Sequence, residues 1–265
     1  MSAGTAIVRR PSPRLADGIV THVKRAPVDA ERALEQWAGY VGALRDHGWE
    51  IVEAAPADDC PDGVFVEDAA VVLRGVAVLT RPGAPQRRAE VESVGRSLAG
   101  LGLTPHRITA PATLDGGDVM AAGDSVYVGL GRRTNAEGAR QLERALAPPG
   151  LSVVTVPISK VLHLKSAVTA LPGGAVIGYP ASLDDASAFA DLVAAPEEAG
   201  AHVVRLGDGA LLMASGAPRT AELLAARGFE PVLVDIGEFE KLEGCVTCLS
   251  VRVRPDPGPH GPRRP

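Results

Sequence analysis

Two cysteines placed three residues apart near the C-terminus are the first candidates for chemistry. Cys245 and Cys248 lie in the segment 244–253, and the chain has one further cysteine. A Cys-x-x-Cys pair is typical of half a zinc site or of a redox pair, whereas a single thiol serves as a nucleophile. Dense Val, Thr and Leu predict a strand here, on which residues three apart face opposite sides. With no second Cys or His pair at ligand spacing, the pattern favours one nucleophilic thiol over a metal or disulfide site.

Acidic and imidazole side chains stand near the beginnings of other predicted strands. Glu67 and Asp68 occupy opposite faces of a predicted strand, with Asp62 upstream. Asp115 is followed by two glycines that let the backbone approach closely, and His163 lies between two leucines. Taken singly, such acids are usually turn or cap residues, and such a histidine is usually a core residue. They recur at the same place in successive units of the chain, however, and a radial fold would bring those places to one axis.

The composition restricts the class of protein. The chain of 265 residues is 46% hydrophobic but 3% aromatic, so its core must consist of Val, Leu, Ala and Ile, which favours a sheet-rich α/β fold. A net charge of -5 gives no electrostatic basis for binding nucleic acid or an anionic membrane. The sequence has no apolar run of membrane-spanning length and no signal-peptide pattern. We therefore expect a cytoplasmic protein with reduced cysteines and a small-molecule partner.

Hydrophobic periodicity predicts alternating strands and helices. The predicted helices are 29–47 with Asp29 as N-cap, 85–100, 135–147, 184–195 and 219–227. The predicted strands are 5–10, 49–53, 64–73, 76–80, 118–122, 125–129, 152–157, 166–171, 175–178, 201–206, 210–214, 231–235 and 248–253.

These elements form five units of strand, strand, helix and strand, at a spacing of about fifty residues. Such a period is typical of a propeller or a solenoid, because one unit alone cannot bury its apolar face. A doubly wound parallel sheet is the alternative, although the paired strands within each unit fit it poorly, and the repeat alone leaves both open. We expect one catalytic domain over 1–254 and a disordered Pro/Gly-rich tail over 255–265.

Several ordered blocks together carry a resemblance to a known family. They are Phe-Val-Glu-Asp at 65–68, the segment 80–88, Thr-Leu-Asp-Gly-Gly-Asp at 113–118, Arg-Thr-Asn-Ala-Glu-Gly at 133–138, Leu-His-Leu-Lys at 162–165 and Thr-Cys-Leu-Ser-Val at 247–251. In this order and spacing, over residues 6–253, the chain resembles the dimethylarginine dimethylaminohydrolases. The resemblance implies the five-bladed α/β propeller of the guanidino-group modifying (pentein) superfamily.

The resemblance also implies roles for matching positions. Cys248 is the expected nucleophile, His163 the general acid and base, and Asp115 the carboxylate near them. The expected substrate-binding residues are Glu67 and Asp68 around the guanidinium group, Asp62 near the α-amino group, Arg87 and Arg133 on the α-carboxylate, Ile19 and Leu242 through their backbones, and Phe65. Ile19 lies in a loop that resembles the family's lid, where the family usually has Leu. A second departure lies at 200–204, where the family often has an Asn-Cys pair.

The implied reaction is hydrolysis of Nω-methylated arginines to citrulline and a methylamine, through a covalent thiouronium on Cys248. A guanidinium carbon is a poor electrophile, so it requires a strong nucleophile and fixed counter-charges, which cysteine and acids supply. The resemblance implies no cofactor and no metal, a small-molecule substrate, no nucleic-acid or membrane partner, and a monomer or homodimer. The alternatives are an arginine or agmatine deiminase of the same superfamily and a non-catalytic binding module, as in the ribosome anti-association initiation factor.

Overall fold

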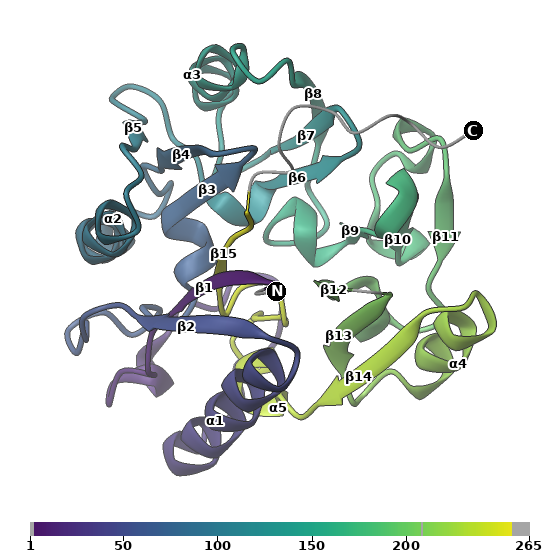
Figure 1. Cartoon of the computed structure of the whole chain (residues 1–265). Coiled ribbons are helices and arrows are strands. Elements are labelled where there is room, and N and C mark those ends of the chain that lie inside the picture. Colours follow the sequence, from purple (N-terminus) through teal and green to yellow (C-terminus); the bar gives the residue numbers. More distant parts are fainter. Residues whose placement is uncertain (1–2, 208, 256–265) are drawn as a thin grey trace.

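The strands form five three-stranded sheets, the blades, around a central axis (Figure 1). This computed structural model describes residues 3–207 and 209–255. In every blade the inner strand pairs antiparallel with a middle strand, which pairs parallel with an outer strand. The predicted five-bladed α/β propeller is therefore confirmed.

The blades are listed from inner to outer strand. Blade 1 is β15 (Val251–Val253), β1 (Gly4–Val8) and β2 (Trp49–Glu53); blade 2 is β3 (Ala70–Leu73), β4 (Val76–Leu79) and β5 (His106–Arg107); blade 3 is β6 (Val119–Ala122), β7 (Ser125–Leu130) and β8 (Ser152–Pro157); blade 4 is β9 (Val168–Ala170), β10 (Val176–Gly178) and β11 (Leu192–Ala194); blade 5 is β12 (Val203–Gly207), β13 (Ala210–Ala214) and β14 (Glu230–Val234).

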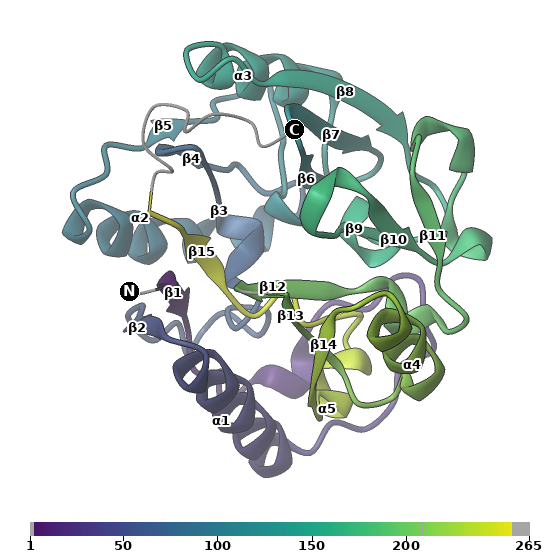
Figure 2. The same cartoon turned by 45° about the vertical axis from the view of Figure 1, so that its right-hand side comes forward.

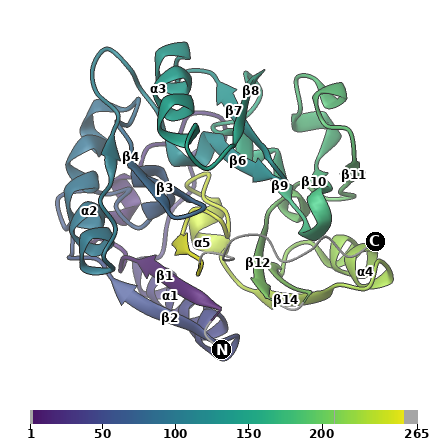
Figure 3. The same cartoon turned by 45° about the horizontal axis from the view of Figure 1, so that its top comes forward.

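Four helices lie at the periphery of the ring, and a short fifth lies nearer its centre (Figure 1, Figure 2 and Figure 3). They are α1 (Ala30–Asp46), α2 (Val91–Gly100), α3 (Ala136–Leu146), α4 (Pro218–Ala226) and the short α5 (Gly237–Glu240). The predicted N-cap of α1 is confirmed, because the Asp29 side chain accepts the backbone N–H of Arg32. The helix buries Trp37 and Leu44 on one face against the core.

Blade 4 departs from the sequence prediction. The helix predicted over 184–195 is wrong: a single 3-10 turn, Ala186–Ala188, is followed by strand β11. The Asp185 side chain accepts the N–H of Ser187 and closes only that turn, and β11 supplies the parallel partner that β10 requires. The strand predicted at 201–206 exists as β12, but it opens blade 5 rather than completing blade 4.

The C-terminal strand closes the ring. Strand β15 pairs antiparallel with β1, with Thr5 opposite Val253 and Ile7 opposite Val251. This strand begins at Val251, so the strand predicted over 248–253 is shorter than expected and carries neither thiol. The predicted tail lies, apart from Pro255, outside the described residues. Within the described residues, no helix has the length and apolarity needed to cross a membrane.

Candidate active site

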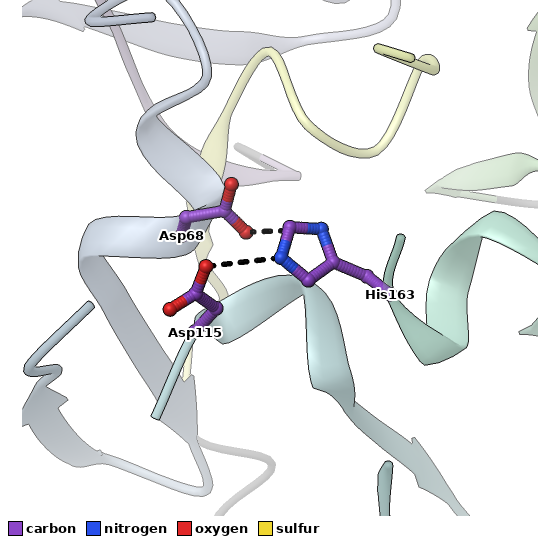
Figure 4. A group of neighbouring side chains, drawn as sticks. All are labelled: Asp68, Asp115 and His163. Carbon is purple, nitrogen blue, oxygen red and sulfur yellow. Dashed lines mark hydrogen bonds and ion pairs between the residues drawn. The ribbon is translucent and has the colours of Figure 1, made fainter. Parts of the chain in front are cut away.

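Short turns carry chemical groups to the axis just before three inner strands. The 3-10 turns Val66–Ala69, Gly116–Asp118 and Leu164–Ser166 precede β3, β6 and β9. Asp68 lies in the first turn, and Asp115 and His163 are the residues immediately before the second and third. Their side-chain ligand atoms lie within 4.8 Å of one another (Figure 4). The prediction that polar groups at equivalent places in successive units meet at one axis is confirmed.

The His163 ring is held between two carboxylates. Its Nε2 lies 3.0 Å from Oδ2 of Asp115, and its Nδ1 lies 3.8 Å from Oδ1 of Asp68. Burial lowers the pKa of His163, but the charges of Asp68 and Asp118 and the hydrogen bond to Asp115 outweigh it and raise the pKa to about 9. His163 is therefore an imidazolium at neutral pH and carries a proton that it can donate.

The same three residues satisfy the distance requirement for a metal site, at which an ion would compete with the proton on His163. An imidazolium has a hydrogen on each ring nitrogen and offers no lone pair to a cation. In addition, Nε2 lies at hydrogen-bonding distance from Asp115, so this nitrogen already has a partner. We interpret the cluster as a buried ion pair.

Gly117 permits the close approach of Asp68 and His163. A Cβ built on it would lie 2.7 Å from Oδ1 of Asp68 and 2.7 Å from Nδ1 of His163. Its backbone N–H donates to Oδ1 of Asp68 at 2.9 Å. Gly117 therefore leaves space for the Asp68 carboxylate and also binds it. The sequence predicted that the two glycines after Asp115 allow a tight turn or a close approach to a ligand, and the structure shows Gly117 in a 3-10 turn against two side chains of the protein.

Asp118 has a supporting position that the sequence analysis did not assign. Its Oδ1 accepts the N–H of Leu164, directly after His163, at 3.0 Å, and its Oδ2 accepts the Thr134 hydroxyl at 2.6 Å. Burial raises the pKa of Asp118 to about 7 despite the opposing charge of His163. The Gly-Gly-Asp sequence was visible, but no pattern predicted which backbone group its acid would bind.

The nucleophile candidate lies in a turn rather than on a strand. The N–H of Cys248 donates to the carbonyl of Cys245 at 3.0 Å, and the Cys248 carbonyl accepts the N–H of Glu67 at 3.1 Å. The two sulfurs are 3.3 Å apart, so the expectation that the thiols face opposite sides is wrong. The contact with Cys245, burial and the charges of Glu67 and Asp68 raise the pKa of Cys248 well above that of an ordinary thiol.

One small cavity collects most of the predicted site residues. Nine of the eleven line it: Ile19, Asp62, Phe65, Asp68, Arg87, Arg133, His163, Leu242 and Cys248. Asp115 lies behind His163 and is fully buried. The cavity volume is about 10 Å³, close to the minimum for one water molecule. The site is therefore closed, and its walls must separate before a larger molecule can enter.

Glu67 is the predicted site residue that points elsewhere. It belongs to the same 3-10 turn as Asp68, not to a strand as predicted, because β3 begins only at Ala70. Its Oε1 lies 2.5 Å from Nζ of Lys165 and 3.0 Å from Nη2 of Arg252. These three residues line a second cavity, of about 350 Å³, between the inner strands. Within one turn, Glu67 thus faces this second cavity while Asp68 faces the closed one.

The two predicted carboxylate-binding arginines have different surroundings. Arg87 is buried and bound by Asp68 at 2.5 Å and Glu90 at 2.8 Å, and it donates to the carbonyls of Asp62 and Phe65. Within the described residues, Arg133 has a single polar contact through its side chain, 3.3 Å from Nη1 to Oδ2 of Asp115. Arg133 therefore retains more donors for a ligand than Arg87.

A loop over the cavity is anchored by two acids. The N–H of Ile19 donates to Oδ1 of Asp62 at 3.1 Å. The N–H groups of Thr21 and Val23, each at 3.0 Å, and that of His22 donate to the Glu243 carboxylate. Glu243 also lines the cavity, and sequence reasoning missed it, because no local pattern connects it with a loop more than two hundred residues away.

Comparison with solved structures defines the class of the protein. A cysteine-to-serine variant of the Pseudomonas aeruginosa dimethylarginine dimethylaminohydrolase in complex with citrulline matches with a TM-score of 0.87 at 35% identity, covering 95% of this chain and 100% of that one. An adduct of a histidine-to-glycine dimethylarginine dimethylaminohydrolase with S-methyl-L-thiocitrulline also gives 0.87, at 34% identity over 94% of this chain and 99% of that one. The chain is therefore a pentein-type propeller.

Comparison of sequences identifies the family. The chain is 63% identical over 254 residues to the N(G),N(G)-dimethylarginine dimethylaminohydrolase of Streptomyces coelicolor, covering 96% of this chain and 98% of the relative. It is 37% identical over 252 residues to that of P. aeruginosa, covering 93% of this chain and 98% of the relative. No family model matches the chain. The chain belongs to the dimethylarginine dimethylaminohydrolase family.

Replacing Gly117 by alanine is expected to disrupt the site without unfolding the ring. The new Cβ must displace Asp68 or His163, and a misplacement of about 1 Å can cost about a hundredfold in rate. We expect kcat to fall by about that factor. Gly39→Ala is the control, because a Cβ there meets no atom within 4 Å. Equal kcat values for the two variants would contradict the close contact around Gly117.

Replacing Glu243 by alanine is expected to release the loop at residues 21–23. Loss of the acceptor for three backbone N–H groups should accelerate their hydrogen exchange by about tenfold, which corresponds to about 1.4 kcal/mol. Hydrogen exchange followed by mass spectrometry measures this change. The Glu243→Gln variant keeps one carbonyl acceptor, so its exchange rates should lie between those of the wild type and those of the alanine variant. Unchanged exchange in the alanine variant would show that the loop is held by other contacts.

Proposed function

We propose that the chain hydrolyses Nω-methylated arginines to L-citrulline and a methylamine. The observation that carries this proposal is the convergence of Cys248, His163 and Asp68 on one closed cavity that Arg133 also lines. Membership of the family, at 63% identity to the S. coelicolor relative, supports the same activity. A thiol, a charged imidazole and buried carboxylates are the groups that substitution at a guanidinium carbon requires.

In this proposal Cys248 first loses its thiol proton to solvent, and the resulting thiolate attacks the guanidinium carbon and forms a tetrahedral adduct. The imidazolium of His163, stabilised by Asp115 and Asp68, donates its proton to the departing amine. The C–N bond breaks, and a thiouronium remains on Cys248. His163 is then neutral and accepts a proton from water as the water attacks the same carbon. Expulsion of the Cys248 sulfur yields citrulline and completes the cycle.

The acids that would bind the substrate also restrain the nucleophile. Burial opposes ionisation of Asp68, but the charges of His163 and Arg87 hold its pKa below the usual carboxyl range. Asp68 therefore presents a negative charge to a guanidinium group and disfavours a thiolate on Cys248. A bound guanidinium would neutralise that charge, and its own positive charge would lower the pKa of the thiol. We propose that the substrate itself helps to ionise the nucleophile.

The amino-acid end of the substrate would lie at the other side of the cavity. Arg133 has donors available for an α-carboxylate, while Arg87 would contribute mainly the charge of its buried ion pair. Asp62 lines the cavity beside them and suits an α-amino group. Because the cavity holds about one water, entry of the substrate would require the loop at residues 19–23 to move.

We also propose a localisation, partners and a domain organisation for the protein. We propose a cytoplasmic enzyme, since its three cysteines are free thiols, as a reducing compartment would keep them. The proposal includes no cofactor, no nucleic-acid or membrane partner, and a monomer or homodimer. Residues 1–254 would act as one catalytic domain.

The activity is tested in separate reactions by measuring the urea product of each substrate: citrulline from asymmetric dimethylarginine, monomethylarginine and arginine, and N-carbamoylputrescine from agmatine. We expect citrulline and an equal amount of dimethylamine or methylamine from the methylated substrates, and no product with Cys248→Ser. A higher kcat/KM for arginine, with release of ammonia, would identify a deiminase instead. Absence of turnover with every substrate would favour the alternative that the chain is a non-catalytic binding module.

Replacing Arg133 by alanine is expected to weaken substrate binding. Loss of a hydrogen bond between charged groups costs about 1.5 to 3 kcal/mol, which corresponds to an increase in KM of about ten- to a hundredfold. Arg133→Lys retains the charge without the planar fork and should show a smaller increase. Agmatine lacks the carboxylate and should be a poor substrate. If agmatine matched dimethylarginine, Arg133 would have another role.

The pH dependence of alkylation tests the state of the nucleophile. A raised pKa means that Cys248 is mostly a thiol at neutral pH, and that its reactive thiolate form increases as the pH rises. Iodoacetamide should therefore modify Cys248 slowly, with a rate that increases beyond the ordinary thiol pKa of about 8.5. A chloroacetamidine of similar size carries a positive charge and should react much faster near neutrality. A plateau with iodoacetamide in the mildly acidic range would indicate a preformed thiolate.

A further inference from the structure

The second thiol of the site has no role in the proposed reaction. Cys245 is 3% exposed and Cys248 is 6% exposed, and their sulfurs lie 3.3 Å apart. Of the two, Cys248 lines the cavity. An oxidant that enters the cavity would therefore contact Cys248 first, because Cys245 does not line the cavity.

The backbone between the thiols suits a covalent bond. The hydrogen bond from the N–H of Cys248 to the carbonyl of Cys245, at 3.0 Å, closes a four-residue turn. The Cα atoms at the two ends of such a turn are less than about 7 Å apart, and those of disulfides are about 4.4 to 6.8 Å apart. The sulfurs are already in contact, so rotation of the two side chains brings them to bonding distance.

We propose that Cys245 is the resolving thiol of an oxidation site at Cys248, closing a reversible disulfide that blocks the nucleophile when a peroxide enters the cavity. The proposal concerns regulation of the same site, and its functional meaning rests on the proposed role of Cys248. The chemical class of the reagent is a hydroperoxide, of which hydrogen peroxide is the smallest member.

The reaction has two balanced steps. The Cys248 thiolate attacks one peroxide oxygen, so an S–O bond forms, the O–O bond breaks and hydroxide leaves, giving a sulfenic acid. The Cys245 thiolate then attacks the Cys248 sulfur, so an S–S bond forms, the S–O bond breaks and a second hydroxide leaves. The protons of the two thiols convert the hydroxides to water. Two thiols are oxidised and one peroxide is reduced.

The surroundings of Cys245 suit the second step. The hydrogen bond from Cys248 lowers the pKa of Cys245, although burial opposes this, and the Thr247 hydroxyl lies 3.3 Å from its sulfur. A resolving thiol must act as a thiolate, and a thiolate adjacent to the sulfenic acid captures it before further oxidation. Cys245 therefore has the position that resolution requires, with its sulfur in contact with that of Cys248.

A zinc site is a weaker interpretation of the same pair. Structural zinc takes four ligands, usually cysteine and histidine. Within the described residues, the three-residue cluster that satisfies the distance requirement for an ion is Asp68, Asp115 and His163, and it includes neither thiol. The remaining cysteine, Cys60, lies in the loop after β2, where its carbonyl accepts the N–H of Gly63. Cys60 provides a matched control for oxidation.

The test exposes the protein to hydrogen peroxide and follows intact mass, peptide mass and activity. In the wild-type protein we expect the mass to fall by two hydrogens, the cross-link to join Cys245 and Cys248, and a thiol reductant to restore activity. Cys245→Ser should instead gain oxygen atoms at Cys248, and it should recover at least about tenfold less activity on reduction. Cys60→Ser should behave as the wild type.

The mass measurement does not depend on turnover, so it distinguishes failure of this proposal from failure of the proposed function. Oxygen addition at Cys248 in the wild type without a cross-link would overturn the proposal, and so would a cross-link to Cys60. Equal recovery of the wild type and Cys245→Ser would also overturn it. If Cys245→Ser fails to fold, Cys245→Ala and the wild-type peptide map decide the same question.

Discussion

A row of alternating charges through the centre of the propeller is the constraint on which the site depends. Arg87 contacts Asp68, Asp68 faces His163, His163 bonds to Asp115, and Asp115 contacts Arg133. All five side chains are buried, and an unpaired charge at such depth is costly. Each charged group is therefore stabilised by its neighbours in the row. Because blades 2, 3 and 4 each contribute part of the row, these contacts also fix the positions of the three blades relative to one another.

The row explains why the turns before the inner strands are so compact. A carboxylate and an imidazole reach one axis only if their backbones also approach it, and Gly117 is the residue that permits this. The same arrangement gives the site two opposed tendencies: its acids raise the pKa of His163, and together with the contact to Cys245 and burial they raise the pKa of Cys248. A resting site with a charged acid and an uncharged nucleophile reacts slowly with neutral molecules, because they meet only the small thiolate fraction of Cys248, and it reacts faster when a cation enters.

The sequence predicted those features that depend on local periodicity or recurrence. Asp29 was recognised as a cap from its position before an amphipathic helix, and the recurrent placement of Asp68, Asp115 and His163 indicated a common axis. Paired strands within each unit distinguished a propeller from a parallel sheet, although the repeat alone did not decide between them. The roles of individual residues came from the resemblance to the dimethylarginine dimethylaminohydrolases, because the spacing of the residues does not indicate their roles.

Predictions failed where tertiary contacts decide local structure. The segment 184–195 has helical composition, but β10 needs a parallel neighbour, and pairing outweighs the weak helix propensity of a short segment. Cys248 was placed on a strand because Val, Thr and Leu are dense there, while its carbonyl actually binds Glu67 from another blade. Glu243 was missed because its partners are backbone amides of a distant loop. Side-chain direction is likewise not encoded locally, as Glu67 shows by turning away from the cavity.

The pairing of β15 with β1 has a consequence for synthesis of the chain. Blade 1 is the first to begin and the last to be completed, because its inner strand lies near the end of the described chain. Until then β1 presents an open edge, and the acids and His163 lie in a ring that lacks a thiol. Cys248 joins them in the same event that closes the ring, since it lies three residues before β15. A nascent chain that ends before Cys248 therefore holds the acids and His163 without the nucleophile, and catalytic competence requires the last inner strand to be present.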